Sequence, residues 1–155
     1  MLLYVHIPFC ESKCPYCAFG SVVGKRNLTS AYFDAMIADF REQILKFDMK
    51  NGDIETVFIG GGTPSAVDGG YYEQLFEAVA PYLAKDAEIT TEANPNSASL
   101  AWLSQMKSYG INRVSFGAQS FFEDKLKFLG RIHDAKQIYE AVANAKTAGL
   151  KNINV

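Results

Sequence analysis

Short apolar runs alternate with longer amphipathic segments along this chain of 155 residues. The short runs are rich in β-branched and aromatic residues, which is typical of strands. The longer segments repeat apolar residues every three or four positions, the period of a helix with one buried face. The pattern predicts five strands, at Leu2–His6, Thr56–Gly60, Glu88–Glu92, Arg113–Phe116 and Asn152–Val155.

Helix signals fall between these strands. Ser30 is the expected N-cap of the first helix and Gly52 its stop signal, while Pro81 ends or kinks the second. Asp134 is expected to cap the last helix, which stops at Gly149. The apolar stripe of the first helix is Phe33, Ile37, Phe40, Ile44 and Phe47, and the later helices cover about 71–83, 98–109 and 135–149.

The alternation of strand and helix predicts an α/β fold with parallel strands and helical crossovers. A closed eight-stranded barrel of this kind needs about 250 residues, more than this chain has. We therefore expect a partial (β/α) barrel with outer helices, truncated after its fifth strand. Residues 1–155 show no internal domain boundary, so the rest of the barrel and a C-terminal domain are expected outside them.

Composition narrows the class of protein. Hydrophobic residues make up 48% of the chain, charged residues 21%, and the net charge is -2. These values fit a globular core and argue against a nucleic-acid partner, which requires a basic surface. The apolar N-terminus lacks the basic start of a targeting segment, and no run approaches the roughly 18 apolar residues of a membrane span. A cytoplasmic protein without membrane contact is expected.

The three cysteines carry the strongest chemical signal. Cys10, Cys14 and Cys17 have the spacing Cys-x3-Cys-x2-Cys and directly follow the first strand, which places them at the mouth of the barrel. Three thiolates hold three irons of a four-iron, four-sulfur cluster and leave the fourth iron open. Two alternatives remain at this point: a zinc site with His6 as fourth ligand, and a redox pair of Cys14 and Cys17.

The cysteine spacing, with Tyr16 before the last cysteine, resembles the signature of the radical SAM superfamily. The wider string from Tyr4 to Cys10, Tyr-Val-His-Ile-Pro-Phe-Cys, is similar to one branch of it. That branch comprises the oxygen-independent coproporphyrinogen III oxidases and the HemW-type haem chaperones. The resemblance runs the length of the chain and implies two cofactors, the 4Fe-4S cluster and S-adenosylmethionine (SAM).

Other motifs end the predicted strands, and each has a simpler interpretation. The Gly60–Thr63 segment reads as a tight turn, Glu92 as a solvated carboxylate and Gln119 as a buried amide. Arg131 and His133 read as a surface turn. The resemblance implies instead that Gly61, Gly62 and Thr63 receive the amino group and methionyl part of SAM, that Arg131 pairs with its carboxylate, and that Glu92, Gln119, Tyr4 and Tyr16 are further SAM contacts.

One departure separates the two branches. The oxidases carry a further cysteine two positions after the third cluster cysteine, where this chain has Phe19. This difference favours a haem chaperone, with haem as a further ligand. The alternative is an oxidase that decarboxylates two propionates of coproporphyrinogen III through a SAM-derived radical. The resemblance also implies an electron donor such as a flavodoxin or ferredoxin. A zinc-binding or structural module is the alternative of another class.

Overall fold

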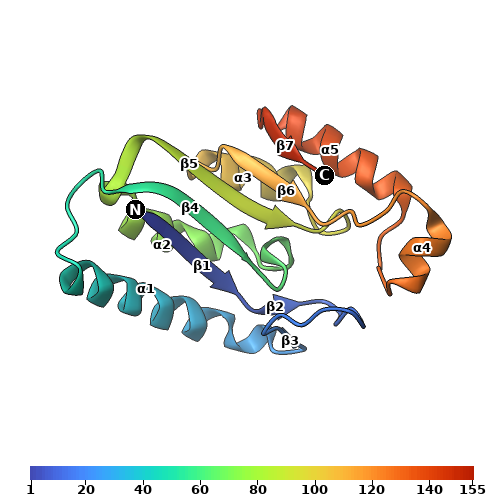
Figure 1. Cartoon of the computed structure of the whole chain (residues 1–155), viewed down its shortest axis with the longest axis horizontal. Coiled ribbons are helices and arrows are strands. Elements are labelled where there is room, and N and C mark those ends of the chain that lie inside the picture. Colours follow the sequence, from blue (N-terminus) through green and yellow to red (C-terminus); the bar gives the residue numbers. More distant parts are fainter.

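A computed structural model describes all residues, 1–155, and centres on a five-stranded parallel sheet (Figure 1). The strand order is β1-β4-β5-β6-β7, so the strands lie side by side in the order in which they occur in the sequence. The strands are β1 (Leu2–Ile7), β4 (Ile54–Gly61), β5 (Leu83–Ala93), β6 (Arg113–Phe116) and β7 (Asn152–Asn154). The predicted parallel α/β partial barrel is confirmed.

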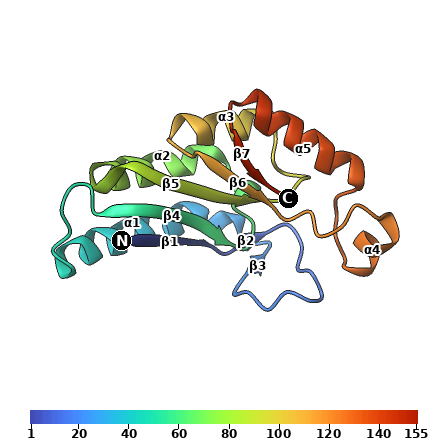
Figure 2. The ribbon, with the colours of Figure 1, turned by 45° about the horizontal axis from the view of Figure 1, so that its top comes forward.

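Four helices form a second layer against one face of this sheet (Figure 2). None of the helices is both long and apolar enough to cross a membrane. The layer consists of α1 (Thr29–Lys46), α2 (Tyr72–Val79), α3 (Leu100–Ser108) and α5 (Ala135–Thr147). The connections between strands and the first two of these helices contain the 3-10 turns η1 (Arg26–Leu28), η2 (Pro64–Ala66), η3 (Gly69–Tyr71) and η4 (Ala80–Tyr82).

The two faces of the sheet differ because side chains alternate along each strand. On β1, Val5 and Ile7 are buried in the main hydrophobic core, while Tyr4 and His6 point to the other face. Val114 of β6 is likewise buried, whereas its neighbour Ser115 lines a pocket. The helix-covered face therefore supplies stability, and the inner face of the partial barrel is left for polar groups.

Several predicted boundaries need correction. Helix α1 begins one residue before Ser30, with Leu28 at the N-cap position and no side-chain cap. Ser30 is therefore not the cap. Strand β5 begins at Leu83, which was predicted as the end of the preceding helix; Pro81 ends that helix in a 3-10 turn. The prediction for Asp134 is confirmed, since its side chain accepts from the Gln137 amide in a full capping box.

Three short elements were not predicted. Helix α4 (Glu123–Phe128) follows β6, and the strands β2 (Phe9–Cys10) and β3 (Val22–Val23) form a separate parallel pair. Each is six residues or shorter, too short for a periodic pattern to identify. They lie at the carboxyl ends of the main strands, on the right of Figure 1.

The helix layer gives a direct test of the packing. Leu103 of α3 is fully buried, and Leu103→Ala in the full-length protein is expected to lower the free energy of unfolding by about 3 kcal/mol. Leu45 of α1 is 82% exposed, so Leu45→Ala should change it by no more than about 0.5 kcal/mol. Denaturant unfolding measures both; equal effects would contradict the described layer.

Candidate functional site

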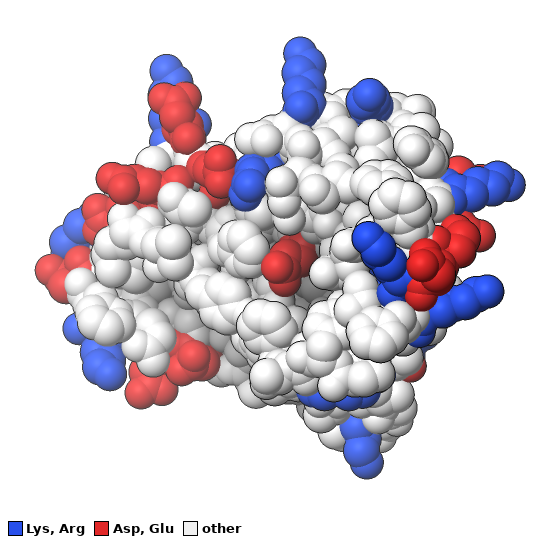
Figure 3. Space-filling model, turned by 45° about the vertical axis from the view of Figure 1, so that its right-hand side comes forward, with Lys and Arg blue, Asp and Glu red and all other residues white.

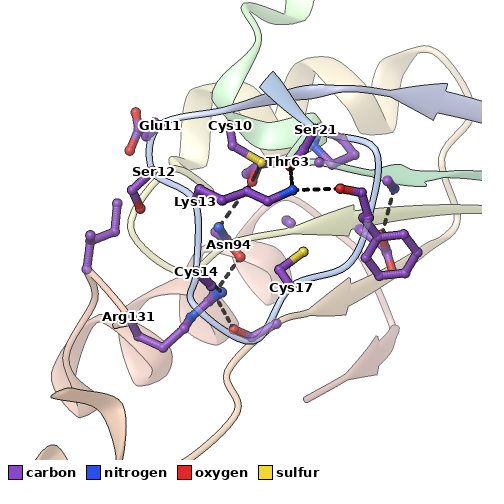
Figure 4. Close-up of a pocket in the computed structure, with 18 of the residues that line it drawn as sticks. Cys10, Glu11, Ser12, Lys13, Cys14, Cys17, Ser21, Thr63, Asn94 and Arg131 are labelled. Carbon is purple, nitrogen blue, oxygen red and sulfur yellow. Dashed lines mark hydrogen bonds between the residues drawn. The ribbon is translucent and has the colours of Figure 1, made fainter. Parts of the chain in front are cut away.

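A pocket of about 270 Å³ opens at the carboxyl ends of the parallel strands (Figure 4). Each of the segments that follow β1, β4, β5 and β6 contributes to it. Parallel strands bring these ends to one edge, which explains why residues distant in sequence meet here. The predicted site residues that line it are Cys10, Cys14, Tyr16, Cys17, Gly61, Gly62, Thr63, Glu92, Gln119 and Arg131.

The cysteines lie on a loop, residues 10–21, that we call the cluster loop. Its base is closed by the β2–β3 pair, and the Val22 amide donates to the Pro8 carbonyl at 2.8 Å. Cys10, Cys14 and Cys17 are half-buried and unpaired. All three cysteines line the pocket, and Figure 4 shows the sulfurs of Cys10 and Cys17 inside the curve of the loop.

The zinc interpretation requires His6 beside the cysteines, and the structure places it elsewhere. His6 does not line the cysteine pocket. Its Nε2 lies 2.8 Å from the Gly20 carbonyl, and its Nδ1 lies 3.1 Å from the Tyr4 hydroxyl. Both ring nitrogens are thus engaged. No three Cys, His, Asp or Glu side chains converge on a single ion position.

Polar groups surround the thiols and would support a bound cluster. The Thr63 hydroxyl donates to the Cys10 sulfur at 3.5 Å, and Arg131 Nη1 donates to the Cys14 sulfur at 3.5 Å. Hydrogen bonds to cysteine sulfur stabilise the thiolate and tune the potential of an iron–sulfur cluster. Lys13 braces the loop internally, with Nζ 2.7 Å from the Phe19 carbonyl oxygen.

The glycine turn after β4 is required by close packing. The Gly62 amide donates to the Ile7 carbonyl at 2.7 Å, and a Cβ at Gly62 would lie 2.7 Å from the carbonyl carbon of Pro8. Gly61 has φ +112°, and its Cβ would collide with the His6 ring. The simple interpretation as a tight turn is therefore incomplete, because the glycines let the turn approach the start of the cluster loop.

Glu92 faces this glycine turn from the end of β5. Its Oε2 accepts from the Gly61 amide at 3.1 Å, and a Cβ at Gly60 would lie 2.7 Å from the same oxygen. The half-buried carboxylate leaves acceptor capacity toward the pocket. This combination of carboxylate and backbone fits a ligand ammonium group. It differs from the freely solvated glutamate of the simpler interpretation.

Arg131 is fixed by the ends of two strands. Its Nη2 donates to Asn94 Oδ1 at 2.6 Å and to the Gly117 carbonyl at 2.7 Å. Gln119 lies at the rim, exposed and with φ +66°, a left-handed conformation that costs energy in a residue with a side chain. The interpretation of Gln119 as a buried amide is wrong. The arginine is held in place at the pocket wall before any ligand binds.

The two predicted tyrosines lie in different places. Tyr16 lines the cysteine pocket, and burial raises the pKa of its phenol while the nearby Arg131 opposes this shift. Tyr16 therefore stays protonated at neutral pH and can donate a hydrogen bond. Tyr4 lines a separate apolar groove of about 430 Å³ between β1 and α1 and stacks on Phe58. The structure does not bring Tyr4 into the cysteine pocket.

Asn94 and Lys13 line the site but were not predicted, and the expected position of His133 was wrong. Asn94 joins Arg131 to the Thr63 hydroxyl, which its Nδ2 contacts at 3.3 Å; its position two residues after Glu92 was the available signal. His133, expected on a surface turn, is buried with Nε2 3.0 Å from the Ala118 carbonyl. Burial lowers the pKa of His133. Lys13 gave no signal, because its partners are fixed by the loop fold.

The face of the molecule drawn in Figure 3 carries few charges at its centre. Figure 3 shows Lys, Arg, Asp and Glu side chains mainly at the margins of the face, with a largely uncharged centre containing one acidic group. No broad basic surface is present in this view. A small organic ligand suits such a face better than a polyanion does.

Sequence comparison decides the family. Residues 4–155 match the family described as the Radical SAM superfamily. The chain belongs to the radical SAM superfamily. This finding confirms the expected resemblance, and it implies a 4Fe-4S cluster and SAM as the cofactors of the radical SAM chain. The assignment of individual residues to those cofactors remains a prediction.

Several relatives of this radical SAM chain are curated as "Heme chaperone HemW". The protein from Escherichia coli is 39% identical over 99% of this chain, and that from Bacillus subtilis is 33% identical over 98%. These matches cover 41% and 40% of the relatives, so the chain spans about two fifths of their length. A mitochondrial "Radical S-adenosyl methionine domain-containing protein 1" from Bos taurus is 36% identical over 93% of the chain and matches over 33% of its own length.

The fold of the radical SAM chain also matches a solved enzyme. Coproporphyrinogen III oxidase (HemN) from Escherichia coli superposes with a TM-score of 0.86 and 27% identity, covering 98% of this chain and 36% of that one. A cobalamin-dependent SAM radical enzyme, OxsB, matches with a TM-score of 0.60 at 15% identity, which shows a shared fold. Both matches agree with the partial barrel described above.

The glycine turn of the radical SAM site yields a second prediction. Gly62→Ala in the full-length protein is expected to lower the free energy of unfolding by about 2 kcal/mol, because the new methyl group meets backbone atoms of Pro8. Gly20→Ala is the matched control, since nothing lies within 4 Å of its Cβ and it should cost no more than about 0.5 kcal/mol. A tolerated Gly62→Ala would refute the close approach.

Proposed function

We propose that this chain is the cluster- and SAM-binding part of a haem chaperone of the HemW type. One observation carries the proposal: the HemW protein of Escherichia coli is 39% identical over 99% of the chain, whereas the coproporphyrinogen III oxidase is 27% identical over 98%. The haem-handling activity belongs to the whole protein, of which this chain corresponds to about two fifths.

Cys10, Cys14 and Cys17 would each hold one iron of the cluster. The donor set supports this assignment, since three free thiols face one pocket and two of them accept hydrogen bonds from Thr63 and Arg131. When bound, the cluster and SAM together supply one-electron reductive chemistry at the sulfonium of SAM. The protein orients the cluster and SAM. The cluster loop and the strand ends form the walls of the pocket and limit the access of water.

The remaining site residues would bind SAM. Gly61, Gly62 and Glu92 receive its amino group and methionyl part, with the Glu92 carboxylate as acceptor. Arg131 pairs with its carboxylate through the Nη1 hydrogen that Cys14 leaves free, since both Nη2 hydrogens are bound by Asn94 and Gly117. Thr63, Gln119 and Tyr16 complete the wall of the same pocket. Tyr4 does not line the pocket, but burial and the Glu92 carboxylate raise the pKa of its phenol, and we assign it to SAM by family resemblance.

Phe19 favours haem handling over porphyrinogen oxidation. It lines the pocket with 61% of its surface exposed, at the position where the oxidase branch carries a cysteine. An exposed aromatic ring suits contact with the flat apolar face of a porphyrin. Coproporphyrinogen III oxidation is the second candidate function, supported by the TM-score of 0.86 to the solved oxidase.

An electron donor completes the proposed system. Reduction of the cluster requires one, and a flavodoxin or ferredoxin has suitable chemistry. We also propose a cytoplasmic location, because three unpaired thiols and an oxygen-sensitive cluster require a reducing compartment.

Cluster binding is tested by anaerobic reconstitution of the full-length protein with iron and sulfide. The wild type should bind about four irons per chain and absorb in the visible region. Cys14→Ala should lose most of this iron and colour, whereas Ser12→Ala, a change in the same loop at a residue without a thiol, should retain them. A wild type that binds zinc but no iron, or a Cys14→Ala variant that keeps its iron, would contradict the assignment of the cysteines to an iron–sulfur cluster.

Haem handling is tested with the same full-length protein under reducing conditions. We expect haem to remain bound through gel filtration, with a stable Soret band, and coproporphyrinogen III to be unchanged after incubation with SAM and a reductant. Chromatographic detection of protoporphyrinogen IX at multiple turnovers would instead establish the oxidase. Absence of both haem binding and turnover would reject both candidate functions.

A further inference from the structure

We propose that Gly130 is a positioning residue, the seat on which Pro15 of the cluster loop rests. By this contact Gly130 sets the place of Cys14 relative to Arg131. The proposal rests on the proposed function, because it concerns the same cluster and SAM site. It adds a specific determinant of their relative position that neither the cysteine spacing nor the strand topology contains.

The contact is unusually close. A Cβ at Gly130 would lie 2.7 Å from Cδ and 3.3 Å from Cγ of Pro15. Ordinary contact begins at 3.4 Å, so an alanine would be at least 0.7 Å too near. Gly130 also has φ +65°, a conformation that residues with a Cβ rarely adopt. Two independent features of the backbone thus call for glycine at this position.

Pro15, the residue that contacts Gly130, cannot move away by changing its side-chain rotamer. A flexible side chain would relieve such a clash by changing rotamer, but the pyrrolidine ring of Pro15 is closed on its own backbone. Relief therefore requires movement of the cluster loop or of the segment that carries Gly130. Either movement would change the site, because the two residues are the immediate neighbours of functional ones.

Cys14 precedes Pro15 and Arg131 follows Gly130. Arg131 Nη1 lies 3.5 Å from the Cys14 sulfur, while Nη2 is held by Asn94 and the Gly117 carbonyl. The seat and this hydrogen bond act side by side. Together they fix the position of Cys14 relative to Arg131, which is itself held at the strand ends. Figure 4 shows Arg131, Asn94 and Cys14 next to one another.

Other anchors of the cluster loop act elsewhere. His6 holds Gly20 near the end of the loop, and Thr63 contacts Cys10 at its start. Lys13 joins the loop to itself through Phe19. These contacts fix the base and the internal shape of the loop. The seat on Gly130 adds a contact from β6's side of the sheet, next to Cys14, where the loop is far from its base.

The test compares two glycines in the full-length protein. Gly149 has φ +84° and nothing within 4 Å of its Cβ, so Gly149→Ala carries the backbone strain without the contact. Gly130→Ala carries both. We expect the thermal midpoint of the cluster-free protein to fall by about 3 °C more in Gly130→Ala than in Gly149→Ala. We also expect about tenfold faster loss of iron to a chelator from reconstituted Gly130→Ala.

Electron paramagnetic resonance distinguishes positioning from mere stability. In the reduced protein, the change that SAM causes in the cluster spectrum should be retained in Gly149→Ala and lost or altered in Gly130→Ala. Pro15→Ala in the Gly130→Ala background removes the ring and should restore the spectrum, the iron retention and most of the thermal midpoint. If Gly130→Ala alone does not fold, recovery of folded, cluster-binding protein in the double variant carries the same result.

Three outcomes would contradict the positioning role of Gly130. These are equal effects of the two glycine substitutions, no rescue by Pro15→Ala, or a lower thermal midpoint with normal iron retention and a normal SAM response. Failure of the wild type to bind a cluster would reject the proposed function instead. In that case the thermal comparison in cluster-free protein still decides whether Pro15 rests on Gly130, and the positioning role falls with the cluster.

Discussion

The site depends on how closely the turn after β4 approaches the start of the cluster loop. Gly62 donates to the Ile7 carbonyl at 2.7 Å, and Thr63 donates to the Phe9 carbonyl at 2.8 Å. These bonds extend the contact between β1 and β4 beyond their last paired residues, Ile7 and Gly61. Since Cys10 follows Phe9 at once, the same contact places the first thiol beside the Thr63 hydroxyl. A side chain at Gly62 would separate the two segments and displace the loop from the pocket.

From this constraint the rest of the arrangement follows in steps along the sheet. Glu92 on β5 reaches back to the Gly61 amide, and Asn94 links Thr63 to Arg131. Arg131 then reaches the Cys14 sulfur, which closes a ring of contacts around the pocket. Four loops that are distant in sequence thereby become one site. The parallel order of the strands makes this possible, because their carboxyl ends share one edge.

Periodicity and spacing predicted the strand and helix layers, the parallel fold and the three cysteines at the barrel mouth. They worked because buried faces impose a period and because metal-binding thiols are rarely this close by chance. They could not reveal the burial of His133, which contacts the Ala118 carbonyl across a loop, or the contact of Pro15 with Gly130, which joins segments more than a hundred residues apart. The role of Tyr4 as a SAM contact stays a prediction from family resemblance, since its hydroxyl contacts His6 and it does not line the cysteine pocket.

We propose that the three cysteines leave one iron of the cluster free for SAM. Mössbauer spectroscopy of the full-length protein, reconstituted with ⁵⁷Fe, tests it directly by comparing spectra recorded before and after addition of SAM. We expect about one quarter of the iron signal to move to a distinct component with higher coordination, while the remainder is unchanged. Four irons that respond identically, or a spectrum that SAM leaves unaltered, would contradict it.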